Sequence, residues 1–215
     1  MQKNIFLLFT ALLFTSQFVF AQGMKISIPD ENFRHALIQH DAENGTNYGI
    51  RAAGKNAVFV KDISKISFLV VSHKEIKDLS GIEHFNALLY LDCSHNRIQE
   101  IEIYKNKDLS ALICGQNELQ DLTISESPAL QHLACNNNAL EALQLSGAPN
   151  LKNLWCFNNQ LSSLDISENV FLDSLDCYNN KLSHLDVSNN KKIKAIWCSM
   201  NQLEEIDLSQ NVEIK

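Results

Sequence analysis

The sequence predicts a solenoid of stacked coils, α/β in class but mostly β, with a curved parallel sheet and a small helical N-terminal cap. Two observations predict it. All six cysteines of the 215-residue chain recur at intervals of 21 residues, and an asparagine stands three residues after each cysteine. The cysteines are Cys93, Cys114, Cys135, Cys156, Cys177 and Cys198, and the asparagines are Asn96, Asn117, Asn138, Asn159, Asn180 and Asn201.

Each repeat reads L-x-x-L-x-C-x-x-N-x-L-x-x-[LI]. The pattern resembles the leucine-rich repeat, with cysteine in place of a strand leucine. A weaker copy with a spacing of 22 residues precedes it, so about seven coils are expected over residues 66–215. The 21-residue form resembles the short repeats of secreted Bacteroidota proteins, and the segment Leu79-Ser80-Gly81-Ile82-Glu83 resembles the first coil of internalin-like repeats.

The alternation within one coil predicts its structure. In Leu-x-Cys the two apolar side chains point to one face of a short strand, and the residues beside them point to the other. Stacked coils then form a parallel sheet over one continuous core. The asparagines are expected to bond to backbone groups of their own and neighbouring coils. The second half of the coil, as in Leu164-Asp165-Ile166-Ser167-Glu168-Asn169, predicts an extended stretch or tight turn on the convex side, opposite the strand.

The N-terminal residues 1–21 have the pattern of a secretory signal peptide, with a membrane anchor as the alternative interpretation. A basic start at Met1–Lys3 precedes the apolar run Ile5–Phe14, and Val19-Phe20-Ala21 provides a cleavage site before Gln22. The pattern predicts a secreted, cell-surface or periplasmic protein that is not inserted in the membrane after cleavage.

Residues 22–65 are expected to form an N-terminal cap and a loop. Asp30 is a candidate helix N-cap, and a stripe of residues after it would cover the first coil. The stripe is Phe33, Ala36, Leu37 and His40. The segment Ile28–Phe33 also resembles the N-terminal cap of Bacteroidota leucine-rich proteins.

The segment Asp41–Lys55 is expected to be a loop because it is rich in Gly, Asn and Ala. It offers oxygen ligands at Asp41, Glu43, Asn44 and Asn47. An EF-hand would need glycine at the sixth position and glutamate at the twelfth, which Thr46 and Ala52 occupy instead. A plain solvated turn is therefore favoured over a calcium site, and no metal or cofactor is expected.

Charge and cysteine spacing restrict the chemistry further. The net charge is −7 and becomes one unit more negative if Lys3 is removed with the signal peptide. That balance argues against nucleic acid or an anionic membrane as partner. In-register cysteines on strands about 4.8 Å apart do not converge as disulfides require. Buried free thiols are therefore expected. The next coil would begin at Ile214, so the chain ends inside a repeat, and a fragment of a longer protein is favoured over a last coil that a partner covers.

The outward positions of the predicted sheet carry large aromatic residues. Both tryptophans of the chain fall in one row, two coils apart. Exposed aromatic clusters mark contact sites, although stacked aromatics that stabilise the sheet are the alternative. The predicted ligand-binding residues are Trp155, Phe157, Asp176, Tyr178, Trp197, Asn153, His132 and Asn136.

These observations predict a non-catalytic extracytoplasmic binding module. No phosphate loop, nucleophile elbow or metal-spaced histidine pair is present, so no enzyme activity is expected. The leucine-rich resemblance implies protein–protein interaction or adhesion through the concave sheet, with an extracellular or surface protein as partner. Two alternatives stay open: a glycan-binding protein that stacks sugars on Trp155 and Trp197, and a structural spacer of a longer surface protein.

Overall fold

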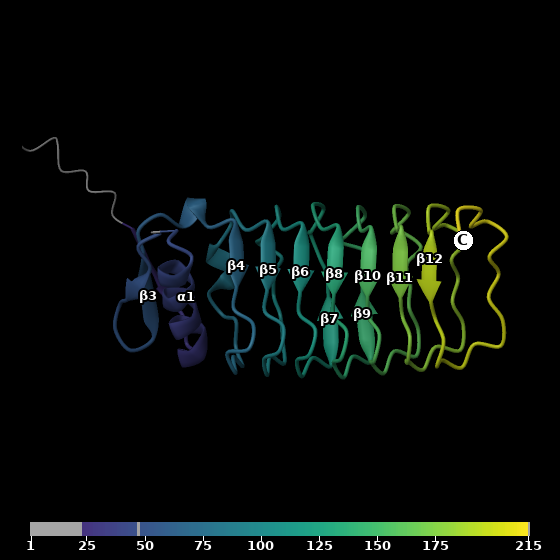
Figure 1. The fold of residues 1–215 in the computed structure, drawn as a ribbon, viewed down its shortest axis with the longest axis horizontal. Coiled ribbons are helices and arrows are strands. Elements are labelled where there is room, and N and C mark those ends of the chain that lie inside the picture. The colour runs from purple at the N-terminus through teal and green to yellow at the C-terminus, as the bar shows by residue number, and fades with distance from the viewer. Residues whose placement is uncertain (1–22, 47, 215) are drawn as a thin grey trace, which may run out of the picture.

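The computed structural model describes residues 23–46 and 48–214. The predicted signal peptide lies outside the described residues. Figure 1 shows an elongated stack of coils that begins with a small N-terminal unit and runs to the C-terminus. This arrangement confirms the predicted solenoid with a parallel sheet and a short N-terminal helix.

The N-terminal unit combines one helix with a three-stranded antiparallel sheet, which the sequence interpretation had not foreseen. Its strands pair in the order β1-β3-β2. The elements are β1 (Met24–Ser27), α1 (Glu31–Glu43), β2 (Arg51–Ala52), β3 (Ala57–Val60) and the 3₁₀ turn η1 (Ile63–Lys65).

Helix α1 begins where the sequence predicted. The Asp30 carboxylate accepts a hydrogen bond of 2.8 Å from the Phe33 amide, which satisfies one of the free N–H groups of the first turn. The same carboxylate accepts bonds from the Lys77 and Asp78 amides in the first coil. Asp30 therefore joins the helix to the repeats. The predicted stripe of four residues on α1 is buried, as expected.

The segment Asp41–Lys55 is not simply a solvated loop. Its first three residues belong to α1, and Arg51–Ala52 pair with β3, because the apolar run Ala57–Val60 offers a strand edge. Asp41 is buried, and its two carboxylate oxygens accept from Thr46 Oγ1 and from the Tyr48 and Ile50 amides. The interpretation of Asp41 as part of a solvated turn was wrong, because its oxygens organise the backbone. Asn47 lies outside the described residues.

The repeats form a seven-stranded parallel sheet with one strand from each coil. Neighbouring strands are aligned so that the middle residue of one lies beside the middle residue of the next, for example Leu154 beside Leu175. The order along the sheet is β4 (Phe68–Val70), β5 (Tyr90–Asp92), β6 (Ala111–Ile113), β8 (His132–Ala134), β10 (Asn153–Trp155), β11 (Ser174–Asp176) and β12 (Ala195–Trp197).

The cysteines directly follow these strands and line the core beneath the sheet. All six are free thiols, which confirms the sequence prediction, and five of them are fully buried. Cys198 is the exception, because it is half-buried in the last coil that contributes a strand. Burial raises the pKa of the Cys135 thiol to about 12, because the charged thiolate is disfavoured away from water.

The predicted asparagine ladder is present in the coils. Asn159 shows the geometry: its Nδ2 donates to the carbonyls of Cys135 and Cys156, and its Oδ1 accepts from the Leu140 amide. Each asparagine thus satisfies backbone groups of its own coil and of the preceding one. The residue two positions after each cysteine has a positive φ, which Asn tolerates better than most residues, as at Asn137, Asn158 and Asn179.

The convex side is extended, as predicted, with tight turns. A 3₁₀ turn η2 (Ile82–His84) lies in the second half of the first coil, and β7 (Asp121–Thr123) pairs in parallel with β9 (Ala142–Gln144). A second series of buried asparagines, not foreseen from the sequence, lies on this side at Asn106, Asn169, Asn190 and Asn211, and Ser127 and Ala148 occupy the two equivalent positions in between. Asn190 Nδ2, for example, donates to the carbonyls of Ile166 and Asn169. Backbone groups are therefore satisfied on both sides of the core.

Candidate binding surface on the sheet

The outer face of the seven-stranded sheet carries the predicted site residues. The last residues of the strands align in one row, here called the central row. It consists of Val70, Asp92, Ile113, Ala134, Trp155, Asp176 and Trp197. Alternation along each strand sends these side chains away from the buried leucines and cysteines on either side of them.

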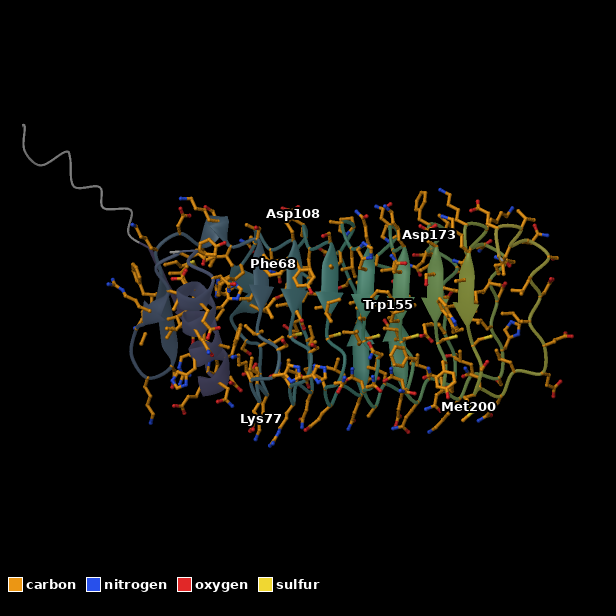
Figure 2. All side chains as sticks on the ribbon, viewed as in Figure 1. Phe68, Lys77, Asp108, Trp155, Asp173 and Met200 are labelled. Atoms are coloured by element: carbon orange, nitrogen blue, oxygen red, sulfur yellow. The ribbon has the colours of Figure 1, made fainter. Side chains whose placement is uncertain are left out.

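Trp155 and Trp197 stand on either side of Asp176 in this row. Trp155 lies beside Asp176, and Asp176 lies beside Trp197, on consecutive parallel strands. Parallel strands are about 4.8 Å apart, so the two tryptophan positions are separated by about 10 Å. Trp155 is 38% exposed and Trp197 is 53% exposed. Both tryptophans of the chain therefore present indole surface on the same face, on which Figure 2 labels Trp155.

Phe157 and Tyr178 extend this aromatic surface on the side of the strand ends. Tyr178 is exposed and Phe157 is half-buried. The Tyr178 amide donates to Asp176 Oδ1 at 3.1 Å, which orients the carboxylate within the face. Partial burial raises the pKa of the Asp176 carboxyl above its ordinary value, and that backbone hydrogen bond only partly opposes the effect.

The remaining predicted residues lie on the N-terminal side of this cluster. Asn153 Nδ2 and His132 Nδ1 are 2.9 Å apart on neighbouring strands, so the two side chains are hydrogen-bonded to each other. Asn136 is half-buried beside Gly115, where an added Cβ would lie 2.9 Å from Asn136 Oδ1. Ala134 in the central row is buried, because its methyl group lies between the larger Ile113 and Trp155. The structure thus places all eight predicted residues on one continuous face.

The sequence interpretation missed an aromatic pair at the other end of this face. Phe68 and Tyr90 stack with ring centroids 4.5 Å apart and planes 13° apart, and Phe68 is 50% exposed. Figure 2 shows Phe68 near the N-terminal end of the stack and Trp155 near its middle. The signal was present in the 22-residue offset, which aligns Phe68 with Tyr90. Phe68 belongs to the first coil, which matches the repeat only weakly.

In the described ranges 23–46 and 48–214, no group of His, Cys, Asp and Glu residues has the arrangement of a metal site. The thiols lie on the core side of the sheet, and desolvation raises the pKa of the Cys177 thiol to about 12, which keeps it protonated at neutral pH. Over the same part of the chain, no helix has the length and apolarity needed to cross a membrane.

No protein-family model matches the sequence, and no curated protein matches it either. Several solved structures are similar. A leucine-rich repeat protein of Leptospira interrogans aligns with a TM-score of 0.61 at 20% identity, covering 71% of this chain and 49% of that one. Internalin C2 of Listeria monocytogenes aligns with a TM-score of 0.58 at 18% identity, covering 89% and 96%.

YopM, a leucine-rich effector protein from Yersinia pestis, aligns with a TM-score of 0.58 at 26% identity, covering 66% of this chain and 40% of that one. The present chain thus spans about half or less of the Leptospira and Yersinia proteins. It has the leucine-rich repeat fold. This finding confirms the fold predicted from the cysteine and asparagine period.

Proposed function

We propose that this protein is a non-catalytic binding module that acts outside the cytoplasm and recognises another protein through the outer face of its sheet. One observation carries the proposal: both tryptophans lie exposed in one row, with Asp176 between them. Leaving large aromatic side chains exposed to water is unfavourable, and such residues dominate the binding energy at protein interfaces.

The energetics of the fold support a binding role for these aromatics. The core is already complete without them, because the strand leucines and the cysteines on either side of Trp155 are fully buried. A tryptophan at an exposed position contributes little to such a core. Stabilisation of the sheet surface alone would favour stacked neighbours, as Phe68 and Tyr90 are, whereas a half-buried carboxylate separates Trp155 from Trp197.

Extracytoplasmic action rests on the sequence. The pattern of residues 1–21 is that of a signal peptide. The chain also resembles repeats of secreted bacterial proteins, and one structural neighbour is an internalin of Listeria. An acidic net charge suits solubility and disfavours nucleic acid.

The proposal can be tested by comparing the full chain with a Trp155→Ala/Trp197→Ala double variant. Immobilised wild-type protein is screened against arrays of extracellular proteins and of polysaccharides. We expect a protein ligand whose affinity falls about 100-fold or more in the double variant, with an unchanged melting temperature. A matched control is Tyr104→Ala/Phe171→Ala, which removes two aromatics of similar exposure that lie outside the sheet strands.

Four other results would contradict the proposal. Equal loss in the control variant would mean that exposed aromatics act nonspecifically. Unchanged affinity in the tryptophan variant would place the site elsewhere. A polysaccharide that binds through the tryptophans would favour the glycan-binding alternative, and no ligand in either array would favour the spacer.

A further inference from the structure

We propose that Trp155, Asp176 and Trp197 form a subsite for a cationic side chain, specifically an arginine of the partner protein. This inference rests on the proposed function and names the chemistry that the aromatic surface would recognise. It follows from the charges on the outer face, from the unpaired state of Asp176 and from the geometry of the central row.

The outer face is acidic and carries no cationic lysine or arginine. Its three rows are the first strand positions, the central row and the positions after the cysteines. Across the seven coils these rows contain the carboxylates of Asp92 and Asp176 and no lysine or arginine. The lysines nearest to the row lie at its rim, where Lys194 pairs with Asp173 at 3.2 Å. A complementary partner would therefore bring positive charge.

The two carboxylates of this face differ in how they are used. Asp92 Oδ1 accepts from the Ser94 amide at 3.0 Å and from Ser94 Oγ at 2.6 Å. Asp176 Oδ1 accepts only the Tyr178 amide, because tyrosine replaces serine at the equivalent position. In the described part of the chain no salt bridge joins Asp176 to a cation. Its second oxygen is free to accept from a ligand.

The surroundings of Asp176 favour a positively charged ligand. The carboxylate is half-buried, and its pKa is raised because desolvation outweighs its one backbone hydrogen bond. A positive charge nearby would compensate that desolvation. An indole face attracts cations through its quadrupole, and Trp is the strongest such group among the side chains. The carboxylate and the two indoles therefore favour the same kind of ligand.

Arginine matches this arrangement better than lysine or a metal ion. Its planar guanidinium stacks on aromatic faces and at the same time donates to a carboxylate. The tryptophan positions are separated by about 10 Å. Asp176 lies between them on the intervening strand, so a guanidinium that bonds to its carboxylate comes within reach of both indoles. One carboxylate is too few ligands for a metal ion.

The fluorescence of the two tryptophans allows binding of an arginine peptide to be measured directly. They are the only tryptophans in the chain, so fluorescence excited selectively at tryptophan, away from tyrosine absorption, reports on this subsite. The full chain is titrated with an acetylated tetra-arginine amide and with its tetra-citrulline counterpart, which has nearly the same shape but no charge. We expect saturable quenching by the arginine peptide at millimolar concentration or below, and affinity at least about tenfold weaker for citrulline.

Two isosteric variants separate the subsite from general electrostatics. Asp176→Asn keeps the acceptor for the Tyr178 amide and should lower the affinity for the arginine peptide to about that for citrulline. Asp92→Asn removes the same charge from the same row, four strands away, and should leave the affinity nearly unchanged.

Equal binding of both peptides, equal effects of both variants, or no quenching at millimolar peptide would overturn the subsite. These outcomes are distinguishable from failure of the proposed function. If a partner protein binds in a tryptophan-dependent manner but with equal affinity to the Asp176→Asn variant, the binding face stands and only the arginine subsite is wrong.

Discussion

The side-chain amide of Asn159 donates a hydrogen bond of 3.1 Å to the main-chain carbonyl of Cys135, one coil earlier in the stack. Together with the bond of 3.0 Å to the Cys156 carbonyl, it connects two consecutive turns of the solenoid beneath the strand ends. The asparagine thus joins coils that are otherwise held by apolar packing and by the sheet.

Asn159→Ala should therefore destabilise the protein without altering the binding face. Loss of the side-chain amide leaves the Leu140 amide without an acceptor, at a cost of about 1–3 kcal/mol. It also removes one of the two asparagine donors to each of the Cys135 and Cys156 carbonyls, which keep their bonds from Asn138 and Asn180. Urea unfolding measures the change. The neighbouring Gln160→Ala is the control, because Gln160 is exposed, and it should change the stability by less than about 0.5 kcal/mol. Identical unfolding midpoints for the two variants would contradict the structural role.

Cys156→Ser should destabilise the core more than Cys198→Ser does. Cys156 is fully buried, and a hydroxyl placed there has no assured partner, which costs about 1–3 kcal/mol. Cys198 is half-buried, so water can satisfy the new hydroxyl. Thermal unfolding of the two variants gives the comparison. A similar loss in both would mean that the last coil is as closed as the middle of the stack.

Alkylation of the native protein should label one thiol quickly. Iodoacetamide reacts with the thiolate, and burial both blocks access and raises the pKa of the Cys93, Cys114 and Cys156 thiols. Cys198 is only half-buried and is therefore the most accessible of the six, although partial burial raises the pKa of its thiol as well. Mass spectrometry should find one added group before denaturation and six after it. Cys198→Ala should remove the native label. An intact disulfide, or uniform labelling of all six, would show that the thiols are not buried and free.

The stability should fall as the solution becomes alkaline. Desolvation raises the pKa of the Cys135 and Cys177 thiols to about 12, whereas a thiol in the unfolded chain ionises near 8.5. Between these values the unfolded state has lost the proton and the folded state keeps it. The free energy of unfolding therefore decreases as pH rises through this window, by up to about 1.4 kcal/mol per pH unit and thiol, and does not change on this account below it.

Denaturant unfolding of wild type and Cys135→Ala at several pH values between 8 and 11 tests this linkage. The variant is expected to be less stable at every pH, but its stability should decline less steeply because one ionising thiol is gone. Parallel declines in the two proteins would indicate that the Cys135 thiol does not contribute to the pH dependence.

Asp30→Ala should loosen the N-terminal cap from the repeats. The substitution removes the hydrogen bond to the Phe33 amide and those to the Lys77 and Asp78 amides, at a cost of about 1–3 kcal/mol. Amide hydrogen exchange should accelerate in α1 and the first coil before the later coils change. Asp30→Asn retains one acceptor oxygen and should have an intermediate effect. Exchange that accelerates uniformly along the chain would argue against a local link.

The sequence by itself determined the fold and the composition of the outer face. A strict 21-residue period leaves one way to bury the leucines and cysteines, and strand alternation then sends Trp155, Asp176 and Trp197 to the other side. The free thiols and the asparagine ladder follow from the same register, because equivalent residues of stacked coils must lie side by side.

Features that are made by non-periodic contacts were decided only by the tertiary structure. The sheet of the N-terminal unit, the buried carboxylate of Asp41 and the stack of Phe68 on Tyr90 involve residues outside the strict repeat. The second series of buried asparagines recurs with the period, but burial on the convex side depends on how tightly the turns pack. For Asp92 and Asp176, the sequence shows that serine follows one and tyrosine the other two positions later. Only the structure shows which hydrogen bonds each carboxylate accepts and how far it is buried, because both depend on how neighbouring coils pack.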